Sequence, residues 1–406
     1  MKLIGPFAEV LTLDKLPARG PLKDEQLQMV KKGGILVKNE SILQVGNFEA
    51  LRKESDAEIE EVTGSLTAFP GFVDCHTHIC FGGSRAKDFA ARNSGKTYQE
   101  IASAGGGIWD TVTQTREADQ GTLENTTADR LNTLLRRGVT TVEIKSGYGL
   151  GLDELKILRA IQSVAKKHRA DIVSTCLAAH IVPGEFQNEE EYLTYILNNL
   201  EPFIEQERLT RRFDIFIEEN AFSKKAALPY LLTLKKRGYD LTVHGDQFST
   251  GGSEVAIECG ALSVDHLEAS GDTEVAALSK STTVPVVLPG ASLGLGLPFG
   301  PARRLLDAGC GLAIASDWNP GSAPNGNLLT QAALLGTYEK MSAAEVFAAI
   351  TYRSARALNL FDRGVLKEGM VADITAFPTD DYREVLYHQG EMQPAQTWKR
   401  GQRIDE

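Results

Sequence analysis

The sequence has few of the features that mark a secreted or membrane-spanning protein. No apolar run among its 406 residues reaches the length of about 18 that a membrane-crossing helix needs. Its five cysteines are an odd number, lie far apart and include no Cys-x-x-Cys pair. This pattern is typical of reduced thiols rather than of a disulfide framework. We therefore expect a cytoplasmic protein.

Basic residues are outnumbered by acidic ones. The chain has 43 Lys and Arg against 54 Asp and Glu, which gives a formal net charge of −11. Nucleic acids and anionic membranes bind basic surfaces, so the sequence predicts neither as a partner. A small anionic substrate is still compatible, because one local arginine can outweigh the overall field. The share of hydrophobic residues, 42%, is that of an ordinary globular protein.

Strand-like and helical patterns alternate along the middle of the chain. Helical stretches are predicted over residues 153–167, 254–258, 302–308 and 343–357, the first from an apolar stripe at i, i+3 and i+4 spacing. Eight such units favour a (β/α)8 TIM-type barrel, and a doubly wound open sheet is the alternative. The apolar, β-rich runs span residues 72–75, 141–144, 172–178, 213–217, 241–243, 262–264, 284–288 and 312–315.

The two ends of the chain differ in texture from the middle. Residues 34–40 and 41–46 form two apolar runs around a polar turn, which predicts a hairpin. Short β-rich runs return after residue 368, and neither end is large enough for a sizeable core. We predict a small β-sandwich domain made from residues 1–65 and 362–406, with residues 66–361 forming the catalytic barrel.

Histidines gather at the predicted strand ends. His76 and His78 are two residues apart, so on a strand their side chains point to the same side. Taken alone, such a pair is as often a polar strand face as a metal site. Five of the seven histidines, however, follow predicted strands, and (β/α)8 barrels carry their active sites at those ends. The five are His76, His78, His180, His244 and His266.

Asp317 follows the eighth run and supplies a carboxylate at the same end of the predicted barrel. Imidazoles plus one carboxylate suit Zn²⁺ or a similar divalent ion, which lowers the pKa of a bound water to about 7. Three histidines and Asp317 would complete a one-metal site. A bridging lysine carbamate for a second ion is not expected, since Glu218 rather than a lysine follows the fourth run. Lys145, after the second run, is expected to pack against or hydrogen-bond a loop.

These strand-end residues resemble the amidohydrolase superfamily, and so does a β-domain built from both chain ends. Longer stretches are similar to one group within it, the enzymes of histidine degradation that open the ring of 4-imidazolone-5-propanoate to give N-formimino-L-glutamate. The stretches that carry this resemblance are residues 81–85, 105–108, 142–150, 178–180, 264–267 and 316–324.

The resemblance implies a role for each site residue. His76, His78, His244 and Asp317 would hold one divalent ion, zinc or iron. His266 and Asp317 would act on the ring carbonyl and the leaving nitrogen, with Gln247 beside them. The residues that would bind the small-molecule substrate, imidazolone propanoate, are Arg85, Tyr98, Tyr148, His180, Asn319, Gly321 and Ser322. The family also suggests a homodimer.

The sequence leaves open the role of Gln247, the roles of Arg85 and the two tyrosines, and the function itself. Many relatives carry Glu where this chain has Gln247, and a glutamine amide cannot act as a general base. Arg85 could simply pair with Asp88 on the surface, and the two tyrosines could cap the barrel rim. At the level of function, the rivals are another cyclic amidohydrolase or deaminase acting on a different ring, and a non-catalytic metal-binding sensor on the same fold.

Overall fold

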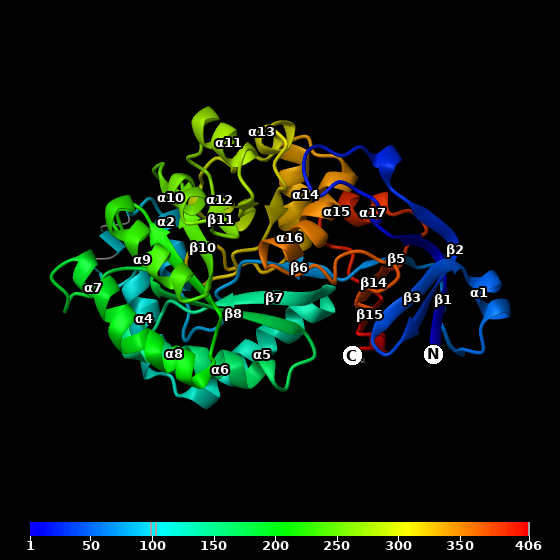
Figure 1. Ribbon diagram of the computed structural model, residues 1–406, viewed down its shortest axis with the longest axis horizontal. Coiled ribbons are helices and arrows are strands. Elements are labelled where there is room, and N and C mark those ends of the chain that lie inside the picture. Colours follow the sequence, from blue (N-terminus) through cyan, green and yellow to red (C-terminus); the bar gives the residue numbers. More distant parts are fainter. Residues whose placement is uncertain (98–99, 102–103, 405–406) are drawn as a thin grey trace.

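Two eight-stranded sheets organise the chain, as the computed structural model of residues 1–97, 100–101 and 104–404 shows (Figure 1). The first is all parallel, and its strands neighbour one another in chain order. Its strands are β6 (Phe72–Asp74), β7 (Val139–Lys145), β8 (Asp171–Ala179), β9 (Arg212–Ile217), β10 (Asp240–Gly245), β11 (Ser263–His266), β12 (Val284–Val287) and β13 (Ala313–Ile314). Each of the eight predicted runs overlaps one of these strands.

The parallel sheet closes on itself. Just beyond its first and last strands, Thr77 and Trp318 form a parallel bridge, so β6 and β13 meet at their carboxyl ends. The (β/α)8 barrel is therefore confirmed, and the open doubly wound sheet is wrong. The strands are buried on both faces, as all seven residues of β7 illustrate, which is the pattern of a parallel sheet covered by helices.

Helices cover the outside of the barrel (Figure 1). The predicted helix over 153–167 is α6 (Glu154–Ala165), which buries Leu155, Leu158 and Ile161 against the sheet. The helix predicted over 343–357 is interrupted, because Thr351 leaves the helical conformation with φ −129° and ψ −106°. The helices that follow barrel strands in the chain are α2 (Ala86–Asn93), α4 (Ile108–Glu117), α5 (Gln120–Arg136), α6, α7 (Glu189–Tyr195), α8 (Glu201–Glu207), α9 (Lys224–Lys236), α10 (Gly252–Glu258), α11 (Asp272–Ser279), α12 (Pro289–Leu295), α13 (Ala302–Asp307), α14 (Leu328–Tyr338), α15 (Ala343–Ala349) and α16 (Tyr352–Ala357).

The second sheet is mixed and draws strands from both ends of the chain. Phe7 of β1 packs edge-to-face on Trp398 of β15, with 5.7 Å between ring centroids. The predicted hairpin is confirmed as β2 and β3. The elements of this part are β1 (Lys2–Leu11), β2 (Met29–Lys38), β3 (Ser41–Asn47), α1 (Phe48–Glu54), β4 (Glu58–Glu61), β5 (Thr67–Pro70), β14 (Ile374–Phe377), α17 (Arg383–Tyr387), β15 (Gln396–Lys399) and β16 (Gln402–Arg403).

One glycine joins the two sheets. Gly71 lies between β5 of the mixed sheet and β6 of the barrel, and a Cβ atom there would lie 2.3 Å from Thr140 Oγ1. Only glycine therefore fits at this crossing. Because β5 pairs with β1 and β14, the mixed sheet reaches slightly past residue 65. The division at residues 65 and 361 stays a prediction.

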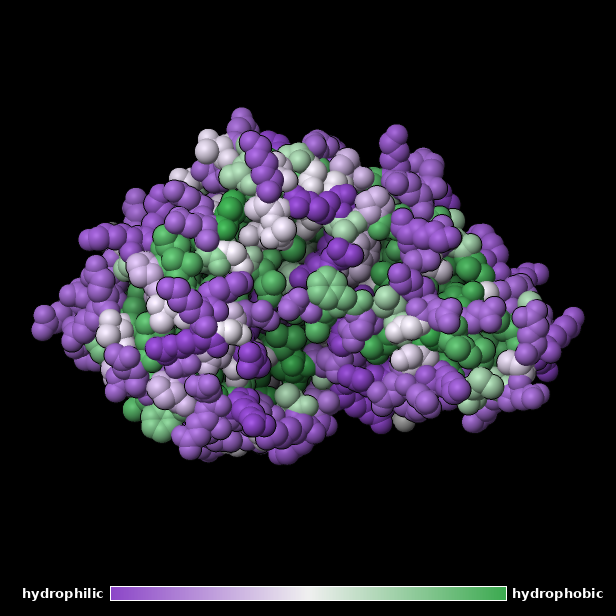
Figure 2. Space-filling model, in the orientation of Figure 1, coloured by the Kyte–Doolittle hydropathy of each residue, from purple (hydrophilic) through white to green (hydrophobic). Residues whose placement is uncertain are grey.

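The visible surface is mostly hydrophilic, with apolar side chains gathered in the hollows between charged ones (Figure 2). Among the helices of residues 1–97, 100–101 and 104–404, none combines the length and apolar character needed to cross a membrane. All five cysteines are buried free thiols, in agreement with the expectation that they are reduced.

Candidate metal centre and active site

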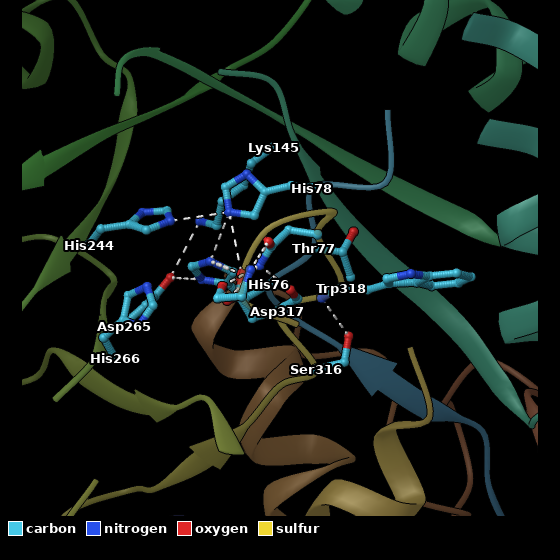
Figure 3. A network of polar contacts seen from close by, with 12 residues as sticks. His76, Thr77, His78, Lys145, His244, Asp265, His266, Ser316, Asp317 and Trp318 are labelled. Carbon is cyan, nitrogen blue, oxygen red and sulfur yellow. Dashed lines mark hydrogen bonds and ion pairs between the residues drawn. The ribbon is translucent and has the colours of Figure 1, made fainter. Parts of the chain in front are cut away.

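Four side chains from three parts of the chain converge at the carboxyl end of the barrel (Figure 3). His78 Nε2 lies 3.2 Å from the Nε2 atoms of both His76 and His244. Asp317 Oδ1 lies 3.5 Å from His76 Nε2 and 3.6 Å from His78 Nε2. Ligand atoms at the corners of a tetrahedron with bonds of about 2.0–2.1 Å are about 3.3–3.4 Å apart. The spacing of His76, His78 and Asp317 therefore fits one divalent ion, and His244 lies next to His78 as a candidate fourth ligand.

The seam of the barrel brings two of these ligand segments together. The N–H of Asp317 donates to the carbonyl oxygen of His76 at 3.0 Å, and the N–H of His78 donates to that of Trp318 at 2.9 Å. Next to the seam, Asp74 accepts a 3.0 Å bond from the N–H of Ser316 and a 2.5 Å bond from its hydroxyl. Asp317 itself has φ 50°, an uncommon conformation for a non-glycine residue.

Two buried aspartates orient the imidazoles. Asp265 Oδ2 lies 2.7 Å from His76 Nδ1, and Asp214 Oδ2 lies 2.8 Å from His244 Nδ1. A carboxylate at Nδ1 keeps the proton there and leaves Nε2 free to bind a metal. The sequence prediction missed both aspartates. The signal that could have found them is strand alternation, which turns Asp214 and Asp265 into the barrel.

Burial sets the charge state of the ligands. It lowers the pKa of His244 to about 3 and that of His76 well below the usual value, in each case mainly by removing water. Both rings are therefore neutral at physiological pH, which is the form that binds metal. Burial also raises the pKa of Asp317 to about 6.

Lys145 does not lie where the sequence predicted. It is the last residue of β7, and its side chain is fully buried. Its ammonium instead lies 2.8 Å from Asp214 and 3.3 Å from Asp265. The prediction was wrong because it ended the strand at residue 144, whereas the strand continues and turns Lys145 inward beside Glu143.

His266 lies against the ligand cluster, 5.3 Å from His244 between ring centroids. Its Nδ1 is 3.5 Å from Glu268 Oε2, a second acid that the sequence prediction missed. Burial opposes charge on His266, but the nearby Glu268 carboxylate outweighs it and raises the pKa of the imidazole. His266 also has φ 96°, so its backbone is held in an uncommon conformation at the site.

A single cavity of about 610 Å³ unites most of the predicted site. This volume is typical of a small-molecule site. His76 lies outside the lining, fully buried, and Tyr98 lies outside the described residues. The predicted residues that line the cavity are His78, Arg85, Tyr148, His180, His244, Gln247, His266, Asp317, Asn319, Gly321 and Ser322.

The 319–322 turn fixes the free oxygen of Asp317. Asn319 Nδ2 donates to Asp317 Oδ2 at 2.9 Å, and the hydroxyl of Ser322 does so at 3.3 Å. The amide oxygen of Asn319, Oδ1, accepts hydrogen bonds from the N–H groups of Gly321 and Ser322, at 2.7 and 2.8 Å. Asn319 and Ser322 thus support the metal ligand as well as lining the cavity.

Arg85 pairs with Asp88 and also lines the cavity. Its Nε lies 2.5 Å from Asp88 Oδ2, so the ion pair with Asp88 is real. Its side chain nevertheless lines the cavity and is only 12% exposed. A Cβ atom at Gly321 would lie 3.2 Å from Arg85 Nη1, so the glycine leaves the end of the guanidinium uncovered.

Buried acids hold two further wall segments. Glu154 accepts bonds from the N–H groups of Gly149 and Leu150, at 3.0 and 2.6 Å, which fixes the turn that carries Tyr148. His180 Nδ1 lies 3.0 Å from the carbonyl oxygen of Gly147 in the same turn. On the other side, Glu218 accepts bonds from the N–H groups after Gln247, those of residues 248 and 249, at 2.8 and 3.1 Å.

Comparisons with known proteins agree with this fold. A family model described as "Amidohydrolase family" matches residues 103–405. The chain is thus an amidohydrolase, as its barrel and strand-end cluster indicate. It is 38% identical to the imidazolonepropionase of Bdellovibrio bacteriovorus, over 99% of this chain and 96% of the relative, and 40% identical to that of Rubrobacter xylanophilus, over 91% of each. The chain belongs to the imidazolonepropionase family.

A solved structure shares the whole architecture. The atrazine chlorohydrolase of Arthrobacter aurescens, solved in complex with zinc, matches over 100% of this chain and 95% of its own, with a TM-score of 0.74. Its sequence identity to this chain is only 17%. The likeness therefore supports the fold alone.

Proposed function

We infer that the protein hydrolyses the ring amide of 4-imidazolone-5-propanoate to N-formimino-L-glutamate, a step of histidine degradation. Membership of the imidazolonepropionase family supports this substrate. The inference depends chiefly on the cavity, whose wall combines the candidate metal ligands His78, His244 and Asp317 with the half-buried guanidinium of Arg85. The metal ligands suit hydrolysis of an amide, and the guanidinium of Arg85 suits binding of a substrate carboxylate.

We propose that His76, His78, His244 and Asp317 hold one divalent ion. A zinc or iron ion there would lower the pKa of a bound water to about 7 and so provide a nucleophile at neutral pH. The zinc in the structural relative supports a divalent metal, and both zinc and iron suit imidazole and carboxylate ligands.

The reaction requires two proton movements around the ring. Water adds to the carbonyl carbon, the C–N bond breaks, and the leaving nitrogen takes a proton. Asp317 can accept a proton from water and deliver it to the leaving nitrogen. His266, whose pKa the nearby Glu268 carboxylate raises, can donate a hydrogen bond that stabilises the negative charge developing on the carbonyl oxygen.

The remaining wall residues bind and orient the substrate in this proposal. Arg85 would bind the propionate, because its guanidinium can pair with a carboxylate through two parallel hydrogen bonds. Tyr148 would also contact the propionate. Tyr98, for which the sequence predicts the same role, lies outside the described residues. His180 would contact the ring, and Gln247 would offer its amide as a hydrogen-bond partner rather than as a base.

Turnover of the proposed substrate tests the function directly. Metal-loaded protein should remove the ultraviolet absorbance of imidazolone propanoate and release N-formimino-L-glutamate in equal amount. Hydantoin, adenosine and guanine serve as comparison substrates for the two rival enzyme classes. Hydrolysis of one of these without ring opening of imidazolone propanoate would overturn the proposal. Binding without turnover would favour a sensor.

We further propose that the protein works as a cytoplasmic homodimer. The five buried free thiols suit a reducing compartment. Light scattering coupled to size exclusion should give twice the 44.1 kDa chain mass. A mass of one chain would contradict the dimer.

A further inference from the structure

The barrel interior next to the ligand cluster is charged. Interior layers of (β/α)8 barrels are usually filled by Val, Ile and Leu. Here Lys145 of β7, Asp214 of β9 and Asp265 of β11 are each fully buried and come from alternate strands. Removing an ion from water costs several kcal/mol even when it is paired. Because these charges reduce stability relative to apolar residues, we expect them to have a functional role.

One ammonium joins the two carboxylates that orient the metal ligands. Lys145 Nζ lies 2.8 Å from Asp214 Oδ2 and 3.3 Å from Asp265 Oδ2. These are the same two oxygen atoms that contact the imidazoles, with Asp214 on His244 and Asp265 on His76. Figure 3 shows Lys145 beside the histidine cluster. Two ligands of the site thus depend on one lysine.

We propose that Lys145 is a positioning residue for the metal centre. Its ammonium donates a hydrogen bond to Asp214 and forms ion pairs with Asp265 and with a third carboxylate, that of Glu143, whose Oε2 is 3.1 Å from Nζ. The three acids are held around one positive centre, which fixes the oxygens that receive the Nδ1 protons. Without that charge, Asp214 and Asp265 would repel each other, and His244 and His76 would lose their fixed orientation.

The lysine is itself held from two directions. Glu143 lies 3.0 Å from the Nε of Arg212, so positive and negative groups alternate from Arg212 through Glu143 to Lys145. The main-chain N–H of Lys145 donates to the carbonyl oxygen of Thr77 at 2.8 Å. Thr77 lies between His76 and His78, so the backbone of β7 also steadies the segment that carries these ligands.

Metal titration of variants tests this role. Protein stripped with a chelator is titrated with Co²⁺, and binding is followed through the visible absorption of the bound ion. Lys145→Met should weaken Co²⁺ binding by about 10–100-fold, as loss of groups that orient ligands does, and should change the absorption spectrum. Lys399→Met is the matched control, because Lys399 is also buried between two acids, 2.8 Å from Asp171, but belongs to the mixed sheet. It should keep wild-type Co²⁺ affinity.

The outcomes separate positioning from simple stabilisation. Wild-type affinity and spectrum in Lys145→Met would overturn the proposal, whatever the loss in melting temperature. If Lys145→Met does not fold, Lys145→Gln, which keeps a donor without the charge, is measured in the same way. The proposal rests on the metal ligands named under the proposed function, not on the substrate. His244→Ala checks those ligands, since unchanged Co²⁺ binding there would mean that the ligand set itself is wrong.

Discussion

The main-chain N–H of Asp317 donates a 3.0 Å hydrogen bond to the carbonyl oxygen of His76. Asp317 follows the eighth barrel strand and His76 follows the first, so the bond that helps close the barrel also sets two candidate metal ligands side by side. The return bond from the N–H of His78 to Trp318, at 2.9 Å, fixes the third. Closure of the barrel therefore brings three of the candidate metal ligands together.

The seam should be sensitive to loss of one hydroxyl. Ser316→Ala removes a donor to Asp74, which is fully buried and has its pKa raised to about 7 by that burial. Leaving a buried acid without this partner should lower the free energy of unfolding by about 1–3 kcal/mol in urea denaturation. Ser94→Ala, at the exposed end of α2, should change it by less than about 0.5 kcal/mol. Equal small effects of both substitutions would contradict a stabilising role for the seam.

Asp317 and Gln247 should differ sharply in their effect on turnover. Asp317→Asn removes both a metal ligand and the proposed proton carrier, so ring opening of imidazolone propanoate should fall below detection. Gln247→Ala removes only an amide, and measurable activity should remain. Steady-state rates of both variants after metal loading make the comparison. If Gln247→Ala is as inactive as Asp317→Asn, the assignment of proton transfer is wrong.

Arg85 should act on substrate binding more than on the chemical step. Arg85→Ala removes the partner of a remote carboxylate, a charged hydrogen bond of about 1.5–3 kcal/mol, and should raise KM by about 10–100-fold with kcat little changed. Arg136→Ala, on the outer helix α5, is the control and should leave both constants unchanged. A large loss of kcat at unchanged KM would contradict the proposed role.

An ion network that joins the two sheets should give a pH-dependent share of stability. Burial opposes charge on Asp171, but Lys399, Arg363 and Arg400 outweigh it and lower its pKa from 3.8 to about 2. A carboxyl whose pKa is lower when folded stabilises the folded state above its unfolded pKa and loses that effect as pH falls toward the folded one. The shift corresponds to about 2 kcal/mol at neutral pH.

Asp171→Asn should therefore destabilise the protein by about 2 kcal/mol at pH 6. Its difference from wild type in urea unfolding should shrink as pH falls from 4 toward 2. Asp129→Asn, an exposed acid on α5, should cost little at any pH. A difference between Asp171→Asn and wild type that does not change with pH would contradict this account.

The sequence was sufficient to predict the barrel and to find the histidines at its strand ends. Apolar runs reveal parallel strands because both faces are buried, and a histidine after such a run needs no knowledge of neighbouring strands to be recognised. His76, His78, His244 and Asp317 were found in this way, together with the family resemblance. The 3.5 and 3.6 Å distances from Asp317 to His76 and His78 then follow from closure of the barrel.

The supporting residues could not be found in the same way. Asp214 lies inside an otherwise apolar run, and its contact with His244 depends on the register between β9 and β10. The prediction for Lys145 was wrong because the observed strand is one residue longer than the predicted one. The extra residue is Lys145 itself, so its side chain forms a buried ion pair instead of contacting a loop. Glu268 follows His266, but only the left-handed backbone at His266 brings the two side chains together.

The central claim is that one metal ion, held by four residues, supports ring opening of imidazolone propanoate. The most direct measurement is the turnover rate of chelator-stripped protein reloaded stepwise with zinc or iron, plotted against the metal bound per chain. The rate should rise linearly and reach its plateau at one ion per chain. A plateau at two ions per chain, or full activity in the stripped protein, would contradict the account.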